Sequence, residues 1–380
     1  MTPRACYLDY NAGAPVRPQV AAAVSRALHD VGNPSSVHRF GRLARRAVED
    51  ARAAVAALVA ASPDCVVFTG SGSEANNLAL KGCGRSRLYV STVEHDSVLR
   101  AAPGATPLPV DRDGIVDLAA LEAALGDSNA PALVSVMLAN NETGVVQPAA
   151  KVAALAHAHN ALFHCDAVQA AGRIALDVAA VGADLLTLSA HKLGGPQGVG
   201  ALVVGEGVAL DPLVHGGRQE EGRRAGTENV AGIVGFGAAA ELAAAEIADS
   251  GRLAALRDEI ERRLTAFAPE ATVFGADVAR LPNTTCVTMP DVSSETQVMA
   301  LDLAGVAVSA GAACSSGKVS ASHVLGAMGV ADSTAGCAIR ISLGWDSRAE
   351  DVDRLVEAWS ALYARTRARP DRSGVPSPAA

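Results

Sequence analysis

Short apolar runs alternate with longer Ala-rich stretches from about residue 62 to residue 248. A turn that contains Gly or Pro bounds the runs, and the stretches between them have helical periodicity. Continuous apolar runs joined by helices are typical of a mostly parallel sheet covered on both faces. This part of the chain is therefore predicted to be α/β. The expected strands are 65–68, 88–90, 133–138, 162–164, 185–188 and 201–204.

The pattern changes after an Ala-rich helical stretch that ends near residue 248. Ser250 and Gly251 interrupt the periodicity, and a charged amphipathic helix follows as far as Arg263. This mixture of helices and short strands predicts a smaller α+β domain. Its β-like runs lie at 283–289, 305–309 and 338–343.

Chain length supports a division into two domains. The 380 residues, of which 49% are hydrophobic, are enough to bury a large core and to form more than one domain. We predict a large domain over residues 14–248 and a small domain that combines residues 1–13 with residues 249–364. Residues 365–380 contain Arg, Pro and Ser without periodicity and are expected to form a frayed tail.

The charge balance and the cysteines narrow the function classes. With 32 Lys and Arg against 40 Asp and Glu, the formal charge is -8, so neither nucleic acid nor a membrane surface is an expected partner. The seven cysteines form no C-x-x-C pair, which favours a reducing compartment over a disulfide framework or a zinc site. The N-terminal residues do not predict a secretory signal, and no apolar run predicts a membrane span. We expect a cytoplasmic protein that acts on a small molecule and binds no metal.

The first motif with chemical meaning is a strand that enters a Gly-rich turn and then a helix. The turn contains Gly70, Gly72 and Ser73, and its free backbone N–H groups and the positive end of the helix dipole suit a phosphate. The same glycines, with Ala75, also match the dinucleotide fingerprint G-x-G-x-x-G/A, and Glu94 follows at about the expected distance. From this segment alone, an NAD-dependent oxidoreductase remains an alternative.

Two later strand ends favour a different cofactor. Asp166 ends one predicted strand and Lys192 follows the next, so both are expected at one edge of the sheet. A lysine in that position can form a Schiff base with an aldehyde cofactor when its pKa is lowered. A carboxylate paired with the pyridinium nitrogen of pyridoxal phosphate makes that ring an electron sink. With the phosphate turn, Asp166 and Lys192 provide the three anchors that this cofactor needs.

Several motifs, taken in order from about residue 7 to residue 345, resemble those of the cysteine desulfurases. The resemblance implies pyridoxal-phosphate fold type I, as in class-V aminotransferases, with a mostly parallel seven-stranded sheet in a large domain and a smaller α+β domain. The matching segments are Tyr-Leu-Asp-Tyr-Asn at 7–11, Asn-Pro-Ser-Ser-Val-His-Arg-Phe-Gly at 33–41, Thr-Gly-Ser-Gly-Ser-Glu-Ala-Asn-Asn at 69–77, Glu-His at 94–95, Asn-Asn-Glu-Thr-Gly at 140–144, His-Cys-Asp-Ala-Val-Gln at 164–169, Ser-Ala-His-Lys at 189–192 and Arg-Ala-Gly-Thr-Glu-Asn at 224–229.

The resemblance assigns roles to individual residues. Lys192 is similar to the Schiff-base lysine, Asp166 to the partner of the ring nitrogen and Gln169 to the donor to the ring hydroxyl. His95 resembles the imidazole that stacks on the ring and assists protonation, and Asn141 resembles a further cofactor contact. The positions similar to the phosphate-binding set are Gly72, Ser73, Ser189 and His191.

The resemblance also concerns a neighbouring subunit and the substrate. Thr227 matches a residue that reaches the phosphate of the neighbouring subunit, which implies a homodimer. Arg340 alternates with apolar residues in its run, a pattern that a solvent-facing arginine fits equally well. The resemblance, together with Asn33, favours a role for Arg340 in binding the substrate carboxylate.

Cys314 lies in a segment of small residues between a short predicted strand and a helix. Its two glycines predict a mobile loop, and Lys318 favours the thiolate. The segment resembles the long catalytic loop of the nitrogen-fixation and housekeeping subgroup of the family. Inert burial is expected for the other cysteines, which are Cys6, Cys65, Cys83, Cys165, Cys286 and Cys337.

The activity that the resemblance implies is cysteine desulfuration. The enzyme converts L-cysteine to L-alanine and transfers the sulfur to Cys314 as a persulfide, for delivery to an acceptor such as an iron–sulfur cluster scaffold. Two alternatives remain: another class-V enzyme, such as a selenocysteine or cysteine-conjugate lyase or an aminotransferase, and a noncatalytic sulfur-trafficking platform. The presence of Lys192, Asp166 and Cys314 together argues against a loss of chemistry.

Overall fold

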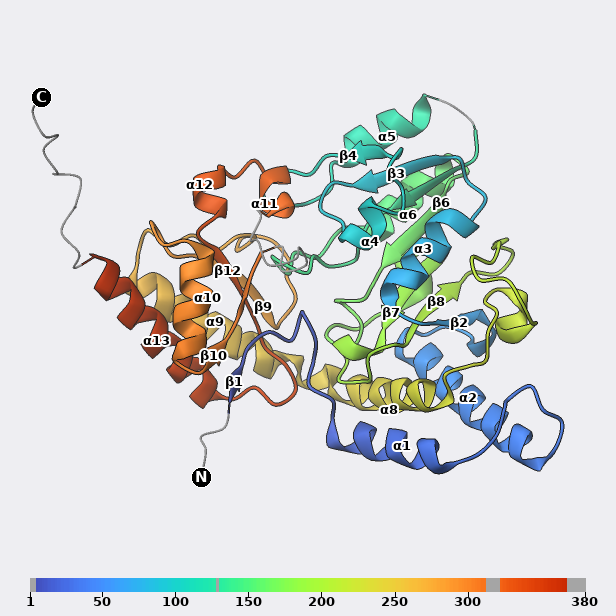
Figure 1. Ribbon diagram of the computed structural model, residues 1–380. Helices are drawn as coiled ribbons and strands as arrows, with labels where there is room; N and C mark the ends of the chain where they lie inside the picture. The colour runs from blue at the N-terminus through green and yellow to red at the C-terminus, as the bar shows by residue number, and fades with distance from the viewer. Residues whose placement is uncertain (1–4, 128–129, 312–321, 368–380) are drawn as a thin grey trace, which may run out of the picture.

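The computed structural model describes residues 5–127, 130–311 and 322–367, and its largest sheet there has seven strands (Figure 1). These strands are β2 (Val66–Thr69), β3 (Arg87–Ser91), β4 (Thr106–Leu108), β5 (Ala132–Ser135), β6 (Leu162–Asp166), β7 (Leu185–Ser189) and β8 (Gly200–Val204). Their order across the sheet is β2-β8-β7-β6-β5-β3-β4. Only β8 runs antiparallel to its neighbours. The mostly parallel seven-stranded sheet that the resemblance implied is confirmed.

Two strands differ from the sequence-based prediction. None of the predicted runs includes β4. Its Pro107 lacks a backbone N–H and is tolerated because β4 lies at the edge of the sheet. The predicted strand at 133–138 ends at Ser135. Beyond it the amides of Val136 and Leu138 still donate to carbonyls of β6, while the chain turns towards the loop at 140–144.

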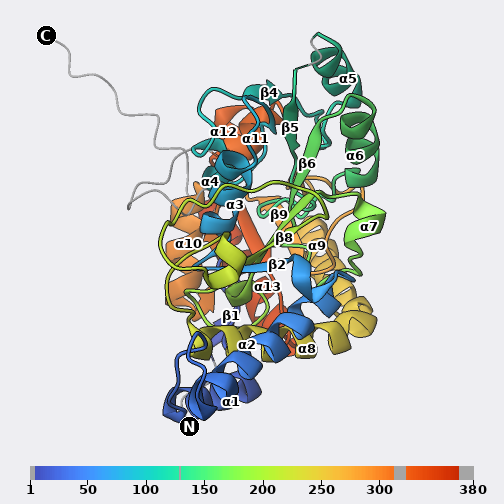
Figure 2. The ribbon, with the colours of Figure 1, turned by 90° about the vertical axis from the view of Figure 1, so that its right-hand side faces the viewer.

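The strands are continuously apolar because helices cover both faces of the sheet. In β2, Val66 and Phe68 pack into one core cluster and Val67 packs into another. Helices α2 (Arg39–Leu58), α5 (Leu118–Gly126), α6 (Ala149–Ala158) and α8 (Val230–Glu246) contribute to the first cluster, and α3 (Gly72–Gly82) and α4 (Asp96–Leu99) contribute to the second. Figure 2 shows α3 and α6 on opposite sides of the strands.

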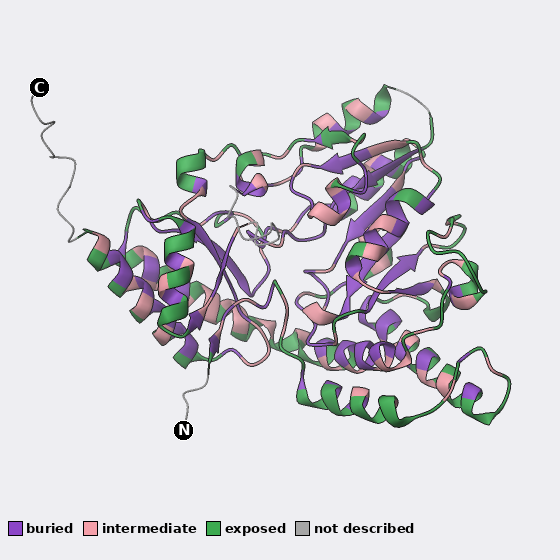
Figure 3. Cartoon of the chain, in the orientation of Figure 1, coloured by how far each residue is buried: buried purple, intermediate pink, exposed green. Residues whose placement is uncertain are grey.

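Helix α8 is almost entirely apolar by sequence and lies against α2, and much of it is buried (Figure 3). Glycines permit the close approach: a Cβ atom at Gly237 would lie 2.7 Å from the Cα atom of Ala51. By length and composition alone, the helical stretch Val230–Phe267 is apolar enough to cross a membrane. Core helices of soluble proteins meet the same criterion, so this one stretch is weak evidence for a membrane span.

A second, three-stranded antiparallel sheet lies on the left in Figure 1. It has the order β11-β12-β9, and a separate parallel pair joins β1 to β10, so the predicted run at 305–309 is divided between two sheets. Apolar residues of β12 pack against α9 and α13, whereas Arg340 and Ser342 alternate with them. The elements are β1 (Cys6–Tyr7), β9 (Thr284–Thr288), β10 (Val306–Ala307), β11 (Ser309–Ala310), β12 (Ala338–Ser342), α9 (Ser250–Phe267) and α13 (Ala349–Arg367).

The chain crosses from the larger to the smaller sheet through η4 (Ile247–Asp249), which joins α8 directly to α9. Ser250 and Gly251, expected to interrupt the helix, instead form the first turn of α9. The crossing lies close to the domain boundary predicted at residues 248 and 249, and the boundaries themselves stay a prediction. The remaining α-helices are α1 (Pro18–His29), α7 (Val178–Val181), α10 (Ser294–Leu303), α11 (His323–Ala327) and α12 (Asp332–Ala335).

Candidate active site

A cavity of about 830 Å³ opens at the carboxyl ends of β6 and β7 and reaches Arg340 of β12. Open α/β sheets bind ligands at this end of their strands. The structure therefore brings together residues from both sheets, and the roles predicted for them remain predictions. The predicted site residues that line the cavity are Gly72, Ser73, His95, Asn141, Asp166, Gln169, Ser189, His191, Lys192 and Arg340.

Asp166 is a buried carboxylate at the end of β6. Its Oδ1 accepts from the amide of Val168 at 3.0 Å, and its Oδ2 accepts from Nδ2 of Asn76 at 2.7 Å. Among the described residues, no Lys, Arg or His forms an ion pair with it. A buried charge is stable only when it is paired. The site thus fits a ligand that brings its own cation, such as a protonated ring nitrogen.

A hydrogen-bonded chain connects Asp166 to His95. Nδ2 of Asn76 also donates to Oγ of Ser97 at 2.9 Å, and that hydroxyl lies 2.8 Å from Nδ1 of His95. The amide of Ser97 donates to the same Nδ1 at 3.1 Å, so Nδ1 is the acceptor and the hydrogen of the neutral imidazole is on Nε2. Sequence reasoning assigned no role to Asn76 or Ser97. The available signal was their spacing, one turn into α3 and two residues after His95.

The N-terminus of α3 forms one wall of the cavity. Ser71 caps the helix by accepting from the amide of Glu74 at 3.1 Å, which leaves the first turn directed at the cavity lined by Gly72 and Ser73. A Cβ atom at Gly72 would lie 3.2 Å from Cβ of Ser189, closer than most side chains tolerate. This small-residue cradle with free amides fits a phosphate group.

His191 lies beside this cradle and is neutral at pH 7. Burial, followed by the charges of Lys192 and Arg173, lowers the pKa of His191 to about 4. A neutral imidazole offers one N–H donor to a phosphate oxygen without adding a charge to the site.

Lys192 is held by the N-terminal segment. Its Nζ donates to the carbonyl of Asn11 at 2.5 Å and to that of Ala12 at 2.9 Å. Nε2 of Gln169 donates to the same Asn11 carbonyl at 3.0 Å, and Oε1 of Gln169 accepts from Arg173. Arg173 therefore fixes the Gln169 amide with its donor group towards the cavity. Sequence reasoning missed Asn11 and Arg173.

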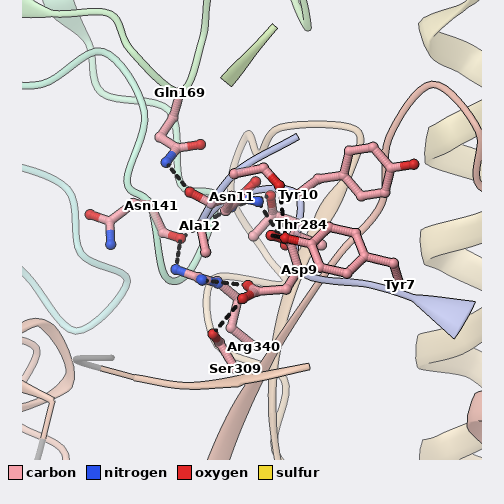
Figure 4. Close-up of polar contacts among 12 residues, drawn as sticks. Tyr7, Asp9, Tyr10, Asn11, Ala12, Asn141, Gln169, Thr284, Ser309 and Arg340 are labelled. Atoms are coloured by element: carbon pink, nitrogen blue, oxygen red, sulfur yellow. Dashed lines mark hydrogen bonds and ion pairs between the residues drawn. The ribbon is translucent and has the colours of Figure 1, made fainter. Parts of the chain in front are cut away.

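Arg340 is buried and carries an acidic partner (Figure 4). Its Nη2 donates to Oδ1 of Asp9 at 2.7 Å, and its Nη1 donates to the carbonyl of Asn141 at 3.1 Å. Oδ2 of Asp9 accepts from Oγ of Ser309 at 2.9 Å. Asp9 belongs to the matching segment at 7–11 but was assigned no role, because residues so distant in the chain meet only in the folded protein.

Three predicted residues do not join this group. Asn33 and Thr227 are exposed and do not line the cavity. Cys314, the predicted sulfur carrier, lies outside the described residues. The six described cysteines are free, and burial raises the thiol pKa values of Cys83, Cys165 and Cys286, so these three are weak nucleophiles at pH 7.

The cavity fits pyridoxal phosphate on three independent features. Asp166 has no cationic partner among the described residues, the N-terminus of α3 offers amides in a cradle of small residues, and Lys192 lies at the same strand ends. A dinucleotide cofactor would use the helix N-terminus but has no need for a lysine at these strand ends.

Comparison with known proteins agrees with this geometry. The family model for aminotransferase class-V matches residues 6–355. A cysteine desulfurase of Cereibacter sphaeroides is 45% identical over 377 residues, which are 95% of this chain and 96% of that protein. The X-ray structure of a NifS-like protein from Rickettsia africae has a TM-score of 0.89 at 35% identity and covers 95% of this chain and 100% of its own. The structure of SspA in complex with cysteine has a TM-score of 0.78 at 32% identity and covers 89% of this chain and 98% of its own.

The fold and the site thus define a class-V aminotransferase type of enzyme. Within that class, the chain belongs to the cysteine desulfurase family. Enzymes of this family depend on pyridoxal phosphate, so this chain is a pyridoxal-phosphate enzyme and the NAD alternative is wrong.

Proposed function

We propose that this enzyme converts L-cysteine to L-alanine and takes up the sulfur on Cys314 as a persulfide. The observation that carries the proposal is the meeting of Lys192, Asp166 and Arg340 in one cavity. A cofactor lysine, a ring-nitrogen partner and a carboxylate-binding group are the three elements that an amino-acid substrate requires. SspA, a structural relative, binds cysteine.

Each of these residues has a separate task. Bound pyridoxal phosphate supplies the electron sink that lets the Cα proton of the substrate leave. Asp166 keeps the ring nitrogen protonated, Lys192 moves the Cα proton, and Arg340 holds the substrate carboxylate. His95 assists protonation of the product carbon.

The sulfur step belongs to Cys314. Its thiolate forms an S–S bond with the substrate sulfur as the substrate C–S bond breaks. The electron pair of the broken bond stays on the carbon skeleton, which takes up protons and leaves as alanine. The outer sulfur of the persulfide then passes to an acceptor protein, which we propose to be an iron–sulfur cluster scaffold in the cytoplasm.

We also propose that the enzyme is a homodimer. Thr227 and Asn33 are exposed within one chain, so any contact with a phosphate or a substrate must involve the site of a second copy. The region around Asn33 carries large apolar side chains exposed to solvent, which favours its burial against another subunit. These side chains are Leu28, Val31, Val37, Phe40 and Leu43. A sedimentation measurement that found a fully active monomer would contradict the dimer.

The direct test of the activity is incubation of the purified, cofactor-loaded enzyme with L-cysteine. Alanine and sulfide should form together in the presence of a reductant. Formation of pyruvate and ammonia in place of alanine would contradict the proposal and favour a lyase.

The Cys314→Ser variant tests the role of the thiol. It should bind pyridoxal phosphate as wild type does, because binding does not use the thiol. Alanine formation should fall by more than the roughly 10²–10⁴-fold expected for loss of a general acid or base, because a hydroxyl cannot carry sulfur as a persulfide. The matched control is Cys337→Ser, in which a half-buried cysteine is replaced and the rate is expected to stay at the wild-type value.

A further inference from the structure

The ion pair between Asp9 and Arg340 joins segments that are 331 residues apart. Both side chains are largely buried, with 16% of the Asp9 side chain and 5% of the Arg340 side chain exposed. Asp9 has two anchors, since one carboxylate oxygen accepts from Arg340 and the other accepts from Ser309. The position of this carboxylate is therefore fixed from two sides.

The pair leaves part of the guanidinium available. Of its five N–H groups, one on Nη2 is directed to Asp9 and one on Nη1 to the carbonyl of Asn141. The Nε atom of Arg340 is buried and has no hydrogen-bond partner among the described residues. Figure 4 shows that Asp9 and Asn141 approach the guanidinium from different sides. The two contacts fix its plane, while the remaining N–H groups are free to bind an anion from the cavity that Arg340 lines.

Two further cationic side chains lie in the surroundings of Arg340. Arg173 is buried nearby, and burial together with the charge of Arg340 lowers the pKa of Arg173 to about 9. Lys192 lines the same cavity as Arg340. Asp9 is the acidic residue in ion-pair contact with Arg340 over the described part of the chain. Glu142 and Asp166 line the cavity, but of these acidic residues Asp9 is the one that contacts the guanidinium, so its loss removes the nearest opposing charge.

We propose that Asp9 is a positioning and affinity-setting residue for the substrate. It orients the guanidinium of Arg340 and offsets its charge, so that the α-carboxylate of an amino acid binds weakly enough to exchange on each turnover. This inference rests on the proposed role of Arg340 in carboxylate binding. It adds that the affinity for the substrate is set by the carboxylate of Asp9, which does not contact the substrate.

Two substitutions separate charge from geometry. Asp9→Asn keeps an oxygen acceptor for Arg340, and the amide N–H₂ can donate to a reoriented Ser309 hydroxyl, so mainly the charge is lost. Asp9→Glu keeps the charge but is one methylene longer in a buried position, which displaces the guanidinium. Opposite effects of the two variants on ligand affinity are the signature of the proposed role.

The readout is the binding of L-alanine to the cofactor-loaded enzyme, measured by the change in absorbance of the bound cofactor. L-alanine has the carboxylate and amino group of the substrate but no sulfur, so its binding does not depend on Cys314 or on turnover. We expect Asp9→Asn to lower the Kd for L-alanine roughly tenfold, because one opposing charge near a partly buried anion site is removed. Asp9→Glu should raise the Kd. The KM for cysteine should follow the same directions.

The matched control is the ion pair between Glu261 and Arg280, away from the cavity. Its side chains are 15% and 6% exposed, similar to those of the Asp9 pair, and the shortest N–O distance is again 2.7 Å. Glu261→Gln should lower the melting temperature, because a buried arginine loses its partner, and should leave the Kd for L-alanine unchanged.

The outcomes are distinct. If Asp9→Asn lowers the melting temperature as Glu261→Gln does but leaves the Kd unchanged, the pair is only structural and the inference is overturned. If Asp9→Asn does not fold, Asp9→Glu decides, and an unchanged Kd in that variant overturns the inference as well. If wild type binds L-alanine with the expected Asp9 dependence but does not desulfurate cysteine, the inference stands and the proposed function fails.

Discussion

The two sides of the active-site cavity bury polar groups in different ways. On the side of the larger sheet, burial shifts the pKa of two titratable groups towards their neutral forms: it raises the pKa of Glu94 well above its usual value and lowers the pKa of His164 to about 4. On the side of the smaller sheet, charges remain and are paired, as in Asp9 with Arg340. Asp166 fits neither description, since it is a buried carboxylate that accepts hydrogen bonds but has no cationic partner among the residues described.

This difference corresponds to what each side must hold. A cofactor remains bound through many turnovers, and an unpaired buried carboxylate such as Asp166 binds a cationic ring nitrogen strongly because little else satisfies it. A substrate must bind and leave repeatedly. An arginine whose charge is already offset, such as Arg340, suits that exchange.

Among these variants, Asn76→Ala is expected to have the largest effect on kcat, because it breaks the hydrogen-bond network on the larger-sheet side. Asn76 donates to both Asp166 and Ser97, so its loss frees the carboxylate and His95 together. We expect kcat to fall roughly 10- to 100-fold, since small displacements of reacting groups have effects of that size. The absorbance of the bound cofactor should also change its dependence on pH, which a purely structural role would not cause.

A buried amide elsewhere provides the control for this variant. Gln297 donates to the carbonyls of Val292 and Cys337 and does not line the cavity. Gln297→Ala should lower the melting temperature without changing kcat per bound cofactor. Equal losses of kcat in both variants would show that Asn76 acts only through stability.

A smaller effect, on the affinity for the cofactor, is expected from Arg173→Met. Arg173 orients the Gln169 amide and contributes to the low pKa of His191. Its loss should raise the Kd for pyridoxal phosphate roughly tenfold, the value of one hydrogen bond to a charged group. Equilibrium dialysis of the apo-enzyme measures this Kd. Arg257→Met, which removes a contact to the carbonyl of Leu281, serves as the control and should leave the Kd unchanged.

The last effect concerns stability rather than activity, namely its pH dependence on the larger-sheet side. The unfolded chain protonates His164 near pH 6.5, whereas the folded chain does so only near pH 4. The unfolded state therefore binds more protons between these values, and the free energy of unfolding falls as the pH is lowered from 6.5 to 4. The contribution is about 1.4 kcal/mol per pH unit, up to roughly 3 kcal/mol.

The variant His164→Gln isolates this contribution. Glutamine does not titrate, and its amide can replace the contacts of His164 with Ser135 and Thr187, which span 2.8 and 3.1 Å. Urea denaturation of the apo-protein at pH 7, 6 and 5 should show a shallower loss of stability in the variant. Parallel curves for both proteins would mean that His164 is protonated normally in the folded state.

The same two sides differ in how far the sequence predicts them. Asp166 ends one strand and Lys192 follows the next. Parallel strands bring such positions to one edge, so local patterns were sufficient to place these two residues together. The apolar runs likewise predicted the strands of the large sheet except β4, because a proline within a short run argues against a strand.

The smaller-sheet side was not predictable in this way. Asp9 meets Arg340 and Ser309 only because β1 pairs with β10 and Asp9 forms a bridge with Ser342. Nothing local to residue 9 indicates these partners. The alternation in β12 limited Arg340 to one face of the strand but did not distinguish solvent from the cavity. Long-range packing, rather than periodicity, decides such positions.

Transfer of sulfur from cysteine to Cys314 can be followed directly on the protein. The cofactor-loaded enzyme is mixed briefly with L-cysteine, alkylated, digested and examined by peptide mass analysis. We expect one additional sulfur on the peptide that contains Cys314, together with free alanine. Additional sulfur on a peptide that contains another of the seven cysteines, or alanine with no protein-bound sulfur, would contradict it.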